Sequence, residues 1–185
     1  SPAQTLTFTR QINAPVAQIY TSFVNRDNIC DWLCYNALLN TEVDGHIFLN
    51  WFDPDNSQHH AYGRFTALEE NQQIAFTWTD ARVSGTQVNV TLHDNGTAVT
   101  LTLDHSGFDA DTPVETIEYY RALWERQLDE LKGILEHGGR PSITNRVIIG
   151  IIPTAFNPNA VADSGIPVDY GAHVDSLVSG YSAEA

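Results

Sequence analysis

The chain has 185 residues, of which 42% are hydrophobic and 10% aromatic, so it can bury the core of one domain and is too apolar for a disordered protein. Its 23 Asp and Glu against 9 Lys and Arg give a formal net charge of −14, which disfavours nucleic acids and anionic membrane surfaces as partners. No apolar run approaches the roughly 18 residues of a membrane-spanning helix, so we expect no membrane span.

The two cysteines, Cys30 and Cys34, are spaced so that they would share one face of a helix. No second Cys or His pair lies nearby in the sequence to complete a zinc site, and no phosphate-binding or dinucleotide-binding motif is present. We therefore expect two buried thiols in a reducing compartment, the cytoplasm, with neither a metal ion nor a cofactor.

The first predicted elements are a strand and two short helices. The alternation in TLTFTRQI, residues 5–12, predicts a strand. NAPVAQIYTSFV, residues 13–24, predicts a helix that begins at Pro15, and NRDNICDWLCYNALL, residues 25–39, predicts a second short helix. The residues expected to be buried are Leu6, Phe8, Val16, Ile19, Tyr20, Phe23, Ile29, Trp32 and Leu33.

Five antiparallel strands are predicted next. GHIFLNWF (45–52), GRFTAL (63–68) and QIAFTWTD (73–80) alternate apolar and polar residues. Two more strands lie within residues 86–108 and are joined through Asp94-Asn95-Gly96, which suits a tight hairpin. One face of these strands is apolar and the other is mostly Thr, Asn and Gln, so the sheet is expected to be covered on one side only.

A long amphipathic helix follows the sheet. Thr112 is placed to cap it, Pro113 suits the first helical position, Glu115 completes a capping box, and Gly138 ends it. About 25 residues at 1.5 Å each span roughly 37 Å, enough to cross the whole sheet. Its apolar stripe is Ile117, Tyr120, Trp124, Leu128, Leu131 and Leu135, and its solvated face carries Glu115, Glu118, Glu125, Asp129 and Glu130.

These elements predict an α+β fold in which a curved antiparallel sheet of about six strands wraps around a long C-terminal helix. A family resemblance is carried by INAPVAQIYTSFVNRDNICDWL, DGHIFLNW, YGRFTALEENQQIAFTW, GTAVTLTLDHSGF and YYRALWERQLDELKGILE. In this order they resemble the AHSA-like family, the homologues of the activator of the heat-shock-protein-90 ATPase. That family belongs to the SRPBCC superfamily of START and Bet-v-1-like helix-grip proteins. The resemblance covers roughly residues 4–138 and implies a helix-grip domain at 1–138 with a cavity, but no single chemistry.

Residues 139–145 are expected to form a linker to a second segment at 146–185. IIGI, residues 148–151, and GIPVDYGAHVDSLVSGYSAEA, residues 165–185, resemble the first part of a PDZ domain of the kind found in bacterial proteases. The pattern stops before the second helix of such a domain, so we expect a truncated PDZ-like segment. A tail unrelated to PDZ domains is the alternative, because short motifs are weak signals.

A large aromatic set on the inward face indicates how the space between sheet and helix is filled. We expect an apolar cavity that binds a small hydrophobic or amphipathic molecule, and the alternative is that the tryptophans simply close the core. The candidate lining residues are Trp51, Phe65, Phe76, Trp78, Val88, Val90, Leu101, Leu103, Tyr120 and Trp124.

His105 and Asp80 are the catalytic candidates. Both continue the inward alternation of their strands and would lie roughly 10 Å apart at one end of the sheet. A His acid/base with a carboxylate would suit a cyclase or hydratase, whereas a structural role for His105 is the simpler interpretation. The adjacent His59 and His60 point apart in an extended chain, so a surface loop is favoured over a metal site.

The ligand-binding function has one further alternative besides an enzyme that uses His105. This is a chaperone- or protease-associated adaptor that acts with a complete PDZ domain in a stress response. As a protein partner, we also expect a second copy of the chain in a homodimer.

Overall fold

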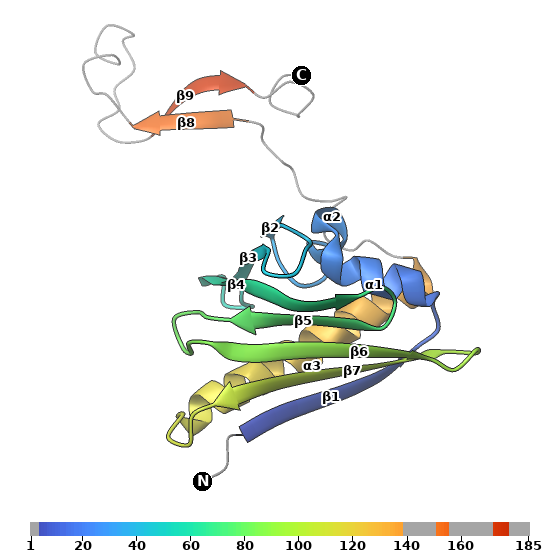
Figure 1. The fold of residues 1–185 in the computed structure, drawn as a ribbon. Helices are drawn as coiled ribbons and strands as arrows, with labels where there is room; N and C mark the ends of the chain where they lie inside the picture. The colour runs from blue at the N-terminus through green and yellow to red at the C-terminus, as the bar shows by residue number, and fades with distance from the viewer. Residues whose placement is uncertain (1–3, 139–150, 156–171, 178–185) are drawn as a thin grey trace, which may run out of the picture. The chain divides into compact units, whose positions relative to one another are not determined.

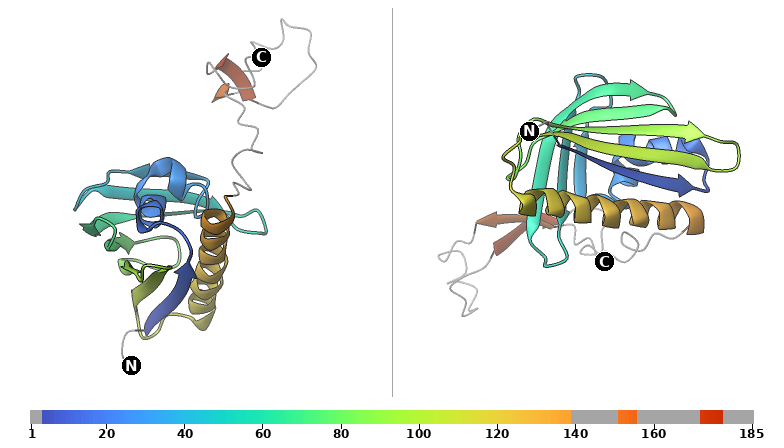
Figure 2. Two further views of the ribbon diagram at one scale, coloured as in Figure 1. Left: turned by 90° about the vertical axis from the view of Figure 1, so that its right-hand side faces the viewer. Right: turned by 90° about the horizontal axis from the view of Figure 1, so that it is seen from below.

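The structure is a computed structural model and describes residues 4–138, 151–155 and 172–177. The chain divides into two compact units, residues 1–141 and 142–185. In the described part of the larger unit, seven strands form one antiparallel sheet that curves around a long helix (Figures 1 and 2).

The larger unit begins with a strand and two short helices, continues through the other six strands, and ends with the long helix. The strand order in the sheet is β1-β7-β6-β5-β4-β3-β2, so β1 is an edge strand that pairs with β7, the last strand of this unit. The bounds are β1 Gln4–Ile12, α1 Val16–Val24, α2 Arg26–Ile29, β2 Asn36–Leu39, β3 His46–Phe52, β4 Gln58–Glu69, β5 Gln73–Trp78, β6 Thr86–Asp94, β7 Val99–Phe108 and α3 Val114–His137.

The bend of the sheet is concentrated in β4. The first half of this strand pairs with β3 and its second half pairs with β5, with a register shift between Phe65 and Ala67. Gly63 lies just before the shift, and a Cβ built there would be 1.8 Å from the carbonyl oxygen of Thr77. Only glycine lets the two strands approach so closely, so the sequence permits the curvature at this point.

Helix α3 lies along the concave face of the sheet (Figure 2). Its 24 residues make it about 36 Å long, and it buries Tyr120 and Trp124 in the space enclosed by the strands. Arg10 on β1 also holds it, because the guanidinium pairs with Glu125 and donates from Nε to Asp129 at 2.8 Å. The predicted curved sheet around a long helix is thereby confirmed.

Two details of the predicted elements are wrong. The segment 25–39 was expected to be one short helix, but α2 ends at Ile29 and residues 36–39 form β2, which pairs with β3. Pairing at the sheet edge overrides a helical pattern that local spacing alone suggests. The sheet therefore has seven strands rather than about six.

The expected capping box of α3 is also absent. Pro113 occupies the N-cap position of α3, and the structure records no side-chain hydrogen bond at that cap. The C-terminus is as predicted: Gly138 adopts a left-handed conformation with φ 65°, and its N–H bonds the carbonyl of Ile134.

The smaller unit has two described strands, β8 Ile151–Ala155 and β9 Ala172–Leu177, which pair antiparallel. Most of the predicted PDZ-like segment, and the whole of the predicted linker at 139–145, lie outside the described residues. The two strands alone do not support a PDZ domain, which therefore stays a prediction. In the part of the chain that the structure describes, no helix has both the length and the apolar character needed to cross a membrane.

Candidate functional site

The loops that follow β3, β5 and β7 gather at one end of the sheet, because alternate strands of an antiparallel sheet run in the same direction. Helix α3 begins at this end as well, since it follows β7 directly. We call this region the loop end. Aromatic and titratable side chains lie close together in this region.

The inward side chains next to the loop end form a continuous aromatic cluster. The ring centroid of Trp78 is 5.5 Å from that of Trp51, 5.6 Å from that of Trp124 and 6.4 Å from that of Tyr120. All ten predicted lining residues are buried on the side of the sheet that faces α3. In this structure their side chains pack against one another, as the alternative of a closed core requires.

His105 lies inside this cluster, and its two ring nitrogens are both hydrogen-bonded. Trp124 Nε1 donates to His105 Nδ1 at 3.1 Å, so the other nitrogen, Nε2, carries the hydrogen. Nε2 therefore donates to Thr86 Oγ1 at 2.9 Å, and Thr86 in turn donates to the carbonyl oxygen of Trp78 at 3.0 Å. These bonds connect α3 to β7, β6 and β5 in one directed chain.

The same surroundings keep His105 uncharged. The side chain is fully buried, and burial lowers its pKa from 6.5 to about 3, although the Asp80 carboxylate opposes the shift. A group with this pKa is a weak base near neutral pH. The observed contacts assign His105 a structural role, and its use as a catalytic acid or base stays a prediction.

Asp80 anchors the loop between β5 and β6. Its Oδ2 accepts from Tyr120 OH at 2.6 Å and Trp78 Nε1 at 2.9 Å, and its Oδ1 accepts the backbone N–H groups of Arg82 at 2.8 Å and Val83 at 3.1 Å. Burial, followed by the hydrogen bond to Asp80, raises the pKa of Tyr120 far above its ordinary value. Tyr120 thus contacts both Asp80, through its hydroxyl, and His105, whose ring centroid lies 4.9 Å from that of Tyr120.

A second polar cluster at the loop end joins the β3–β4 loop to α3. Asp53 Oδ2 lies 2.8 Å from His59 Nε2, and its Oδ1 accepts from Tyr119 OH at 3.2 Å. The guanidinium carbon of Arg82 lies 3.6 Å from the centre of the Tyr119 ring, and Trp51 Nε1 donates to Tyr119 OH at 3.3 Å. Burial raises the pKa of Tyr119 to about 12, so its hydroxyl remains a donor.

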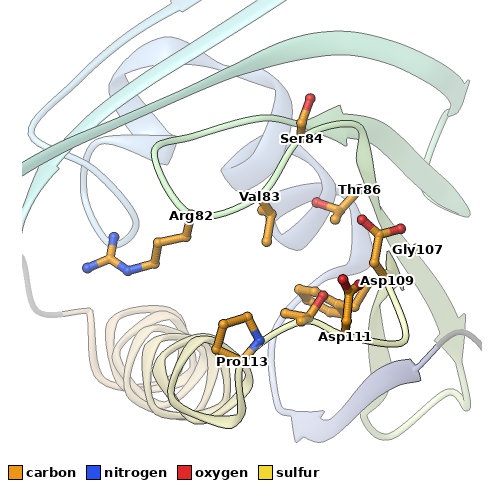
Figure 3. A pocket seen from close by; sticks show the side chains of 10 residues that line it. Arg82, Val83, Ser84, Thr86, Gly107, Asp109, Asp111 and Pro113 are labelled. Atoms are coloured by element: carbon orange, nitrogen blue, oxygen red, sulfur yellow. The ribbon is translucent and has the colours of Figure 1, made fainter.

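A surface pocket of about 260 Å³ opens between the β5–β6 loop and the segment that leads into α3. Figure 3 shows Val83 and Thr86 directed toward this space, with Asp109 and Asp111 along its edge and the guanidinium of Arg82 directed away from it. Phe108 also lines the pocket, and its ring centroid is 4.6 Å from that of His105. Through Phe108, the wall of the pocket therefore contacts the part of the aromatic cluster that contains His105.

None of the ten predicted lining residues borders this pocket, so sequence reasoning missed its wall. Arg82 and Val83 lie in a loop without periodicity, and no sequence signal singles them out. Phe108 was outside the predicted set because the alternation of β7 breaks at Gly107, whose φ is 84°. That glycine was the available signal, since an isolated Gly in a strand pattern indicates a bulge.

A second pocket of about 280 Å³ lies beside the Asp53 cluster and is lined in part by Tyr119 and Arg126.

His59 and His60 lie in β4 and point in opposite directions. The side chain of His59 points inward, and its ring centroid is 5.8 Å from that of Trp51. The side chain of His60 is exposed and stacks on Phe48. The two histidines thus lie on opposite faces of β4, as an extended chain requires. Within the described ranges, no group of three His, Cys, Asp or Glu residues is arranged to hold a metal ion.

Cys30 and Cys34 are both buried, and their sulfur atoms lie 3.5 Å apart. They occupy the turn between α2 and β2 rather than one helix, since α2 ends at Ile29. The burial of the thiols is as predicted.

The curved antiparallel sheet around one long helix is a helix-grip fold. The family model described as "Activator of Hsp90 ATPase homolog 1-like protein" matches residues 13–136, so the chain belongs to this family. A comparison with curated proteins gave no match.

Solved structures agree with the family assignment at the level of the fold. Protein CV1439 from Chromobacterium violaceum is 19% identical with a TM-score of 0.63, and the match covers 73% of this chain and 99% of that one. The Aha1 dimer from Colwellia psychrerythraea is 18% identical with a TM-score of 0.62, and the match covers 73% and 98%. CalU16 from Micromonospora echinospora is 18% identical with a TM-score of 0.61, and the match covers 77% and 80%. Identities this low indicate a shared fold and not a shared ligand.

Proposed function

We propose that the helix-grip domain binds a small, largely apolar molecule between the sheet and α3, and that the molecule enters at the loop end. The observation that carries the proposal is the inward cluster of Trp51, Trp78, Tyr120 and Trp124, which the 260 Å³ pocket approaches at Phe108. Aromatic walls with a few convergent polar groups are typical of small-molecule sites. The ten residues of the predicted cavity are the proposed lining.

The proposed ligand is amphipathic. Its apolar part would replace contacts that the tryptophan rings now make with one another, which restores the apolar burial that opening the cluster removes. Its polar part would remain at the loop end, where Asp109, Asp111 and Thr112 supply polar groups to the pocket wall. The β5–β6 loop, which supplies Arg82, Val83 and Ser84 to the pocket, is the segment that would move to admit it.

Native mass spectrometry of the protein as purified tests the proposal first. A stoichiometric added mass that is released on denaturation supports ligand binding, and extraction then identifies its chemical class. A clean mass without any addition, under conditions that preserve weak complexes, counts against a resident ligand.

A pair of matched variants then tests the entry route. Val83→Trp fills the pocket at the loop end, whereas Val43→Trp adds the same bulk at an exposed position in the β2–β3 loop. With the fluorescent probe anilinonaphthalene sulfonate, Val83→Trp is expected to weaken binding by about tenfold or more and Val43→Trp to leave it unchanged. Equal binding by both variants would show that the probe does not enter at the loop end.

The two alternative functions predict different results. An enzyme that uses His105 requires a polar group of the substrate to replace Thr86 or Trp124 at the ring nitrogens, so loss of turnover in a folded His105 variant would support it. An adaptor would bind a protein client without turnover and would depend on a complete PDZ domain. The hydrogen bonds of His105 favour the ligand-binding proposal over the enzyme.

We also propose that the chain pairs with a second copy. The support is a structural relative, the Colwellia psychrerythraea protein, which was solved in solution as a dimer. At 18% identity the relative supplies the hypothesis, and sedimentation of this chain over a range of concentrations supplies the test.

A further inference from the structure

An exposed apolar patch lies on the outward face of the sheet near β2. It consists of Tyr35, Leu38, Phe48, Phe52 and Tyr62, and we call it the corner patch. Leu38 is 66% exposed, Tyr62 56%, Tyr35 50% and Phe52 43%. Side chains of this size are normally buried, so a contiguous group of them on the surface indicates an interaction site.

The members of the corner patch are neighbours, because the strand register aligns them. Leu38 pairs with Phe48 across β2 and β3, and Phe48 pairs with Tyr62 across β3 and β4, so the three form one row. Phe52 continues the patch along β3, and its ring contacts that of Tyr35 edge-on at 5.4 Å. The patch is thus a surface on hydrogen-bonded strands, so a partner would meet little cost of ordering it.

The outward face around the corner patch has no carboxylates, which suits contact with another acidic chain. The outward positions of β2, β3 and the first half of β4 are the even-numbered residues of 36–39, 46–52 and 58–64, and none of them is acidic in a chain with 23 Asp and Glu. Acidic residues lie instead in the adjoining loops, among them Glu42 and Asp55. Two copies with a net charge of −14 repel one another, and a face without carboxylates at its centre minimises that repulsion.

The edge of β2 is closed to an added strand. Arg26 of α2 donates from Nε to the carbonyl oxygen of Ala37 at 3.2 Å and from Nη2 to Asn36 Oδ1 at 2.9 Å. The N–H of Ala37 bonds the same Asn36 oxygen at 3.0 Å. An extended peptide therefore cannot extend the sheet at this edge without displacing Arg26, so the partner must pack on the outward face.

From these observations we propose that a second copy of this chain docks on the corner patch, with the same patch of both copies in contact across a two-fold axis. The inference rests on the proposed pairing of two copies and names the surface that mediates it. An apolar, aromatic centre within a polar surround that has no carboxylates is the composition of a specific interface. A two-fold arrangement uses the patch on both chains and leaves no open surface for further growth.

Sedimentation velocity of the full-length chain at increasing concentration is the test. Wild-type protein is expected to dimerise, and Leu38→Asp is expected to raise the dissociation constant by about tenfold or more, because it places two carboxylates in the interface. Val114→Asp is the matched control, since Val114 is 65% exposed at the start of α3, outside the patch, and this variant should dimerise as wild type does. Added salt should strengthen the dimer, because it screens the repulsion between the two acidic chains.

The outcomes are distinct. A wild-type chain that stays monomeric contradicts the pairing itself and leaves ligand binding, which native mass spectrometry measures separately, unaffected. A wild-type dimer that Leu38→Asp does not weaken, or that Val114→Asp weakens equally, overturns the corner patch as the interface. Thermal unfolding of each variant checks that a weaker dimer does not result from an unfolded chain. Tyr62→Ser, a second change in the patch that adds no charge, should also weaken the dimer.

Discussion

His105 makes the stability of this domain depend on pH in a calculable way. Burial lowers the pKa of the folded state to about 3 from the ordinary 6.5 that the unfolded chain has. Between these values the unfolded chain binds a proton that the folded chain does not, so the free energy of unfolding falls as the pH is lowered from neutral. Lowering the pH to about 5, roughly 1.5 units below the unfolded value, removes about 2 kcal/mol, and the loss would level off near pH 3.

Comparison of wild type with His105→Gln isolates this contribution. The variant loses part of the bonding to Thr86 and Trp124, so near pH 7.5 it should be less stable by about 1–3 kcal/mol. That difference should shrink by about 2 kcal/mol near pH 5, because glutamine does not titrate.

Urea unfolding followed by tryptophan fluorescence at both pH values measures the difference. His93→Gln, a change at an exposed position on β6, is the control and should follow the wild type at both pH values to within about 0.5 kcal/mol. A difference between wild type and His105→Gln that is the same at both pH values would refute the reasoning that His105 is buried and uncharged.

Two further predictions concern the frame around the site. Asp80→Asn puts an amide NH₂ in place of one of two oxygens that together accept four hydrogen bonds, so it should lower the free energy of unfolding by about 2–4 kcal/mol, measured in urea. The control Asp111→Asn, at an exposed pocket edge, should change that free energy by less than about 0.5 kcal/mol. Gly63→Ala should destabilise the domain by more than about 1 kcal/mol because the added Cβ meets a backbone oxygen, while Gly133→Ala in α3, where nothing lies within 4 Å, should stabilise it by about 0.5–1 kcal/mol. Thermal unfolding that ranks the two alanine variants in the opposite order would contradict the account of the β4 bend.

The elements that repeat a local period were predictable. Alternation of apolar residues in 86–108 and the helical stripe of 114–137 specify strand and helix through the side-chain period alone, and Gly138 marks the helix end for a steric reason that is likewise local. The same reasoning was wrong for residues 36–39, where apolar residues suit either a helix or a strand and pairing with β3 decides between them.

The candidate site was predictable only in its apolar part. The inward positions of the sheet and of α3 follow from periodicity, and all ten of these side chains are buried, whereas their role as the lining of a cavity stays a prediction. The wall of the pocket was not predictable, because Arg82 and Val83 lie in a loop with no periodic pattern. The path of that loop depends on hydrogen bonds that Asp80 accepts from Trp78 on β5 and Tyr120 on α3. Loop residues of this kind carry no period from which to infer a direction.

The sequence by itself determined an acidic α+β domain with one apolar sheet face, a long amphipathic helix and a family resemblance that the family model confirms. Only the tertiary structure decided that His105 Nδ1 accepts from Trp124, that Arg26 closes the edge of β2, and that three apolar side chains from separate strands form one outward row. The physical reason is sequence distance. A period of two or 3.6 residues is written in neighbouring residues, whereas these contacts join side chains that only the strand register and the docking of α2 and α3 bring together.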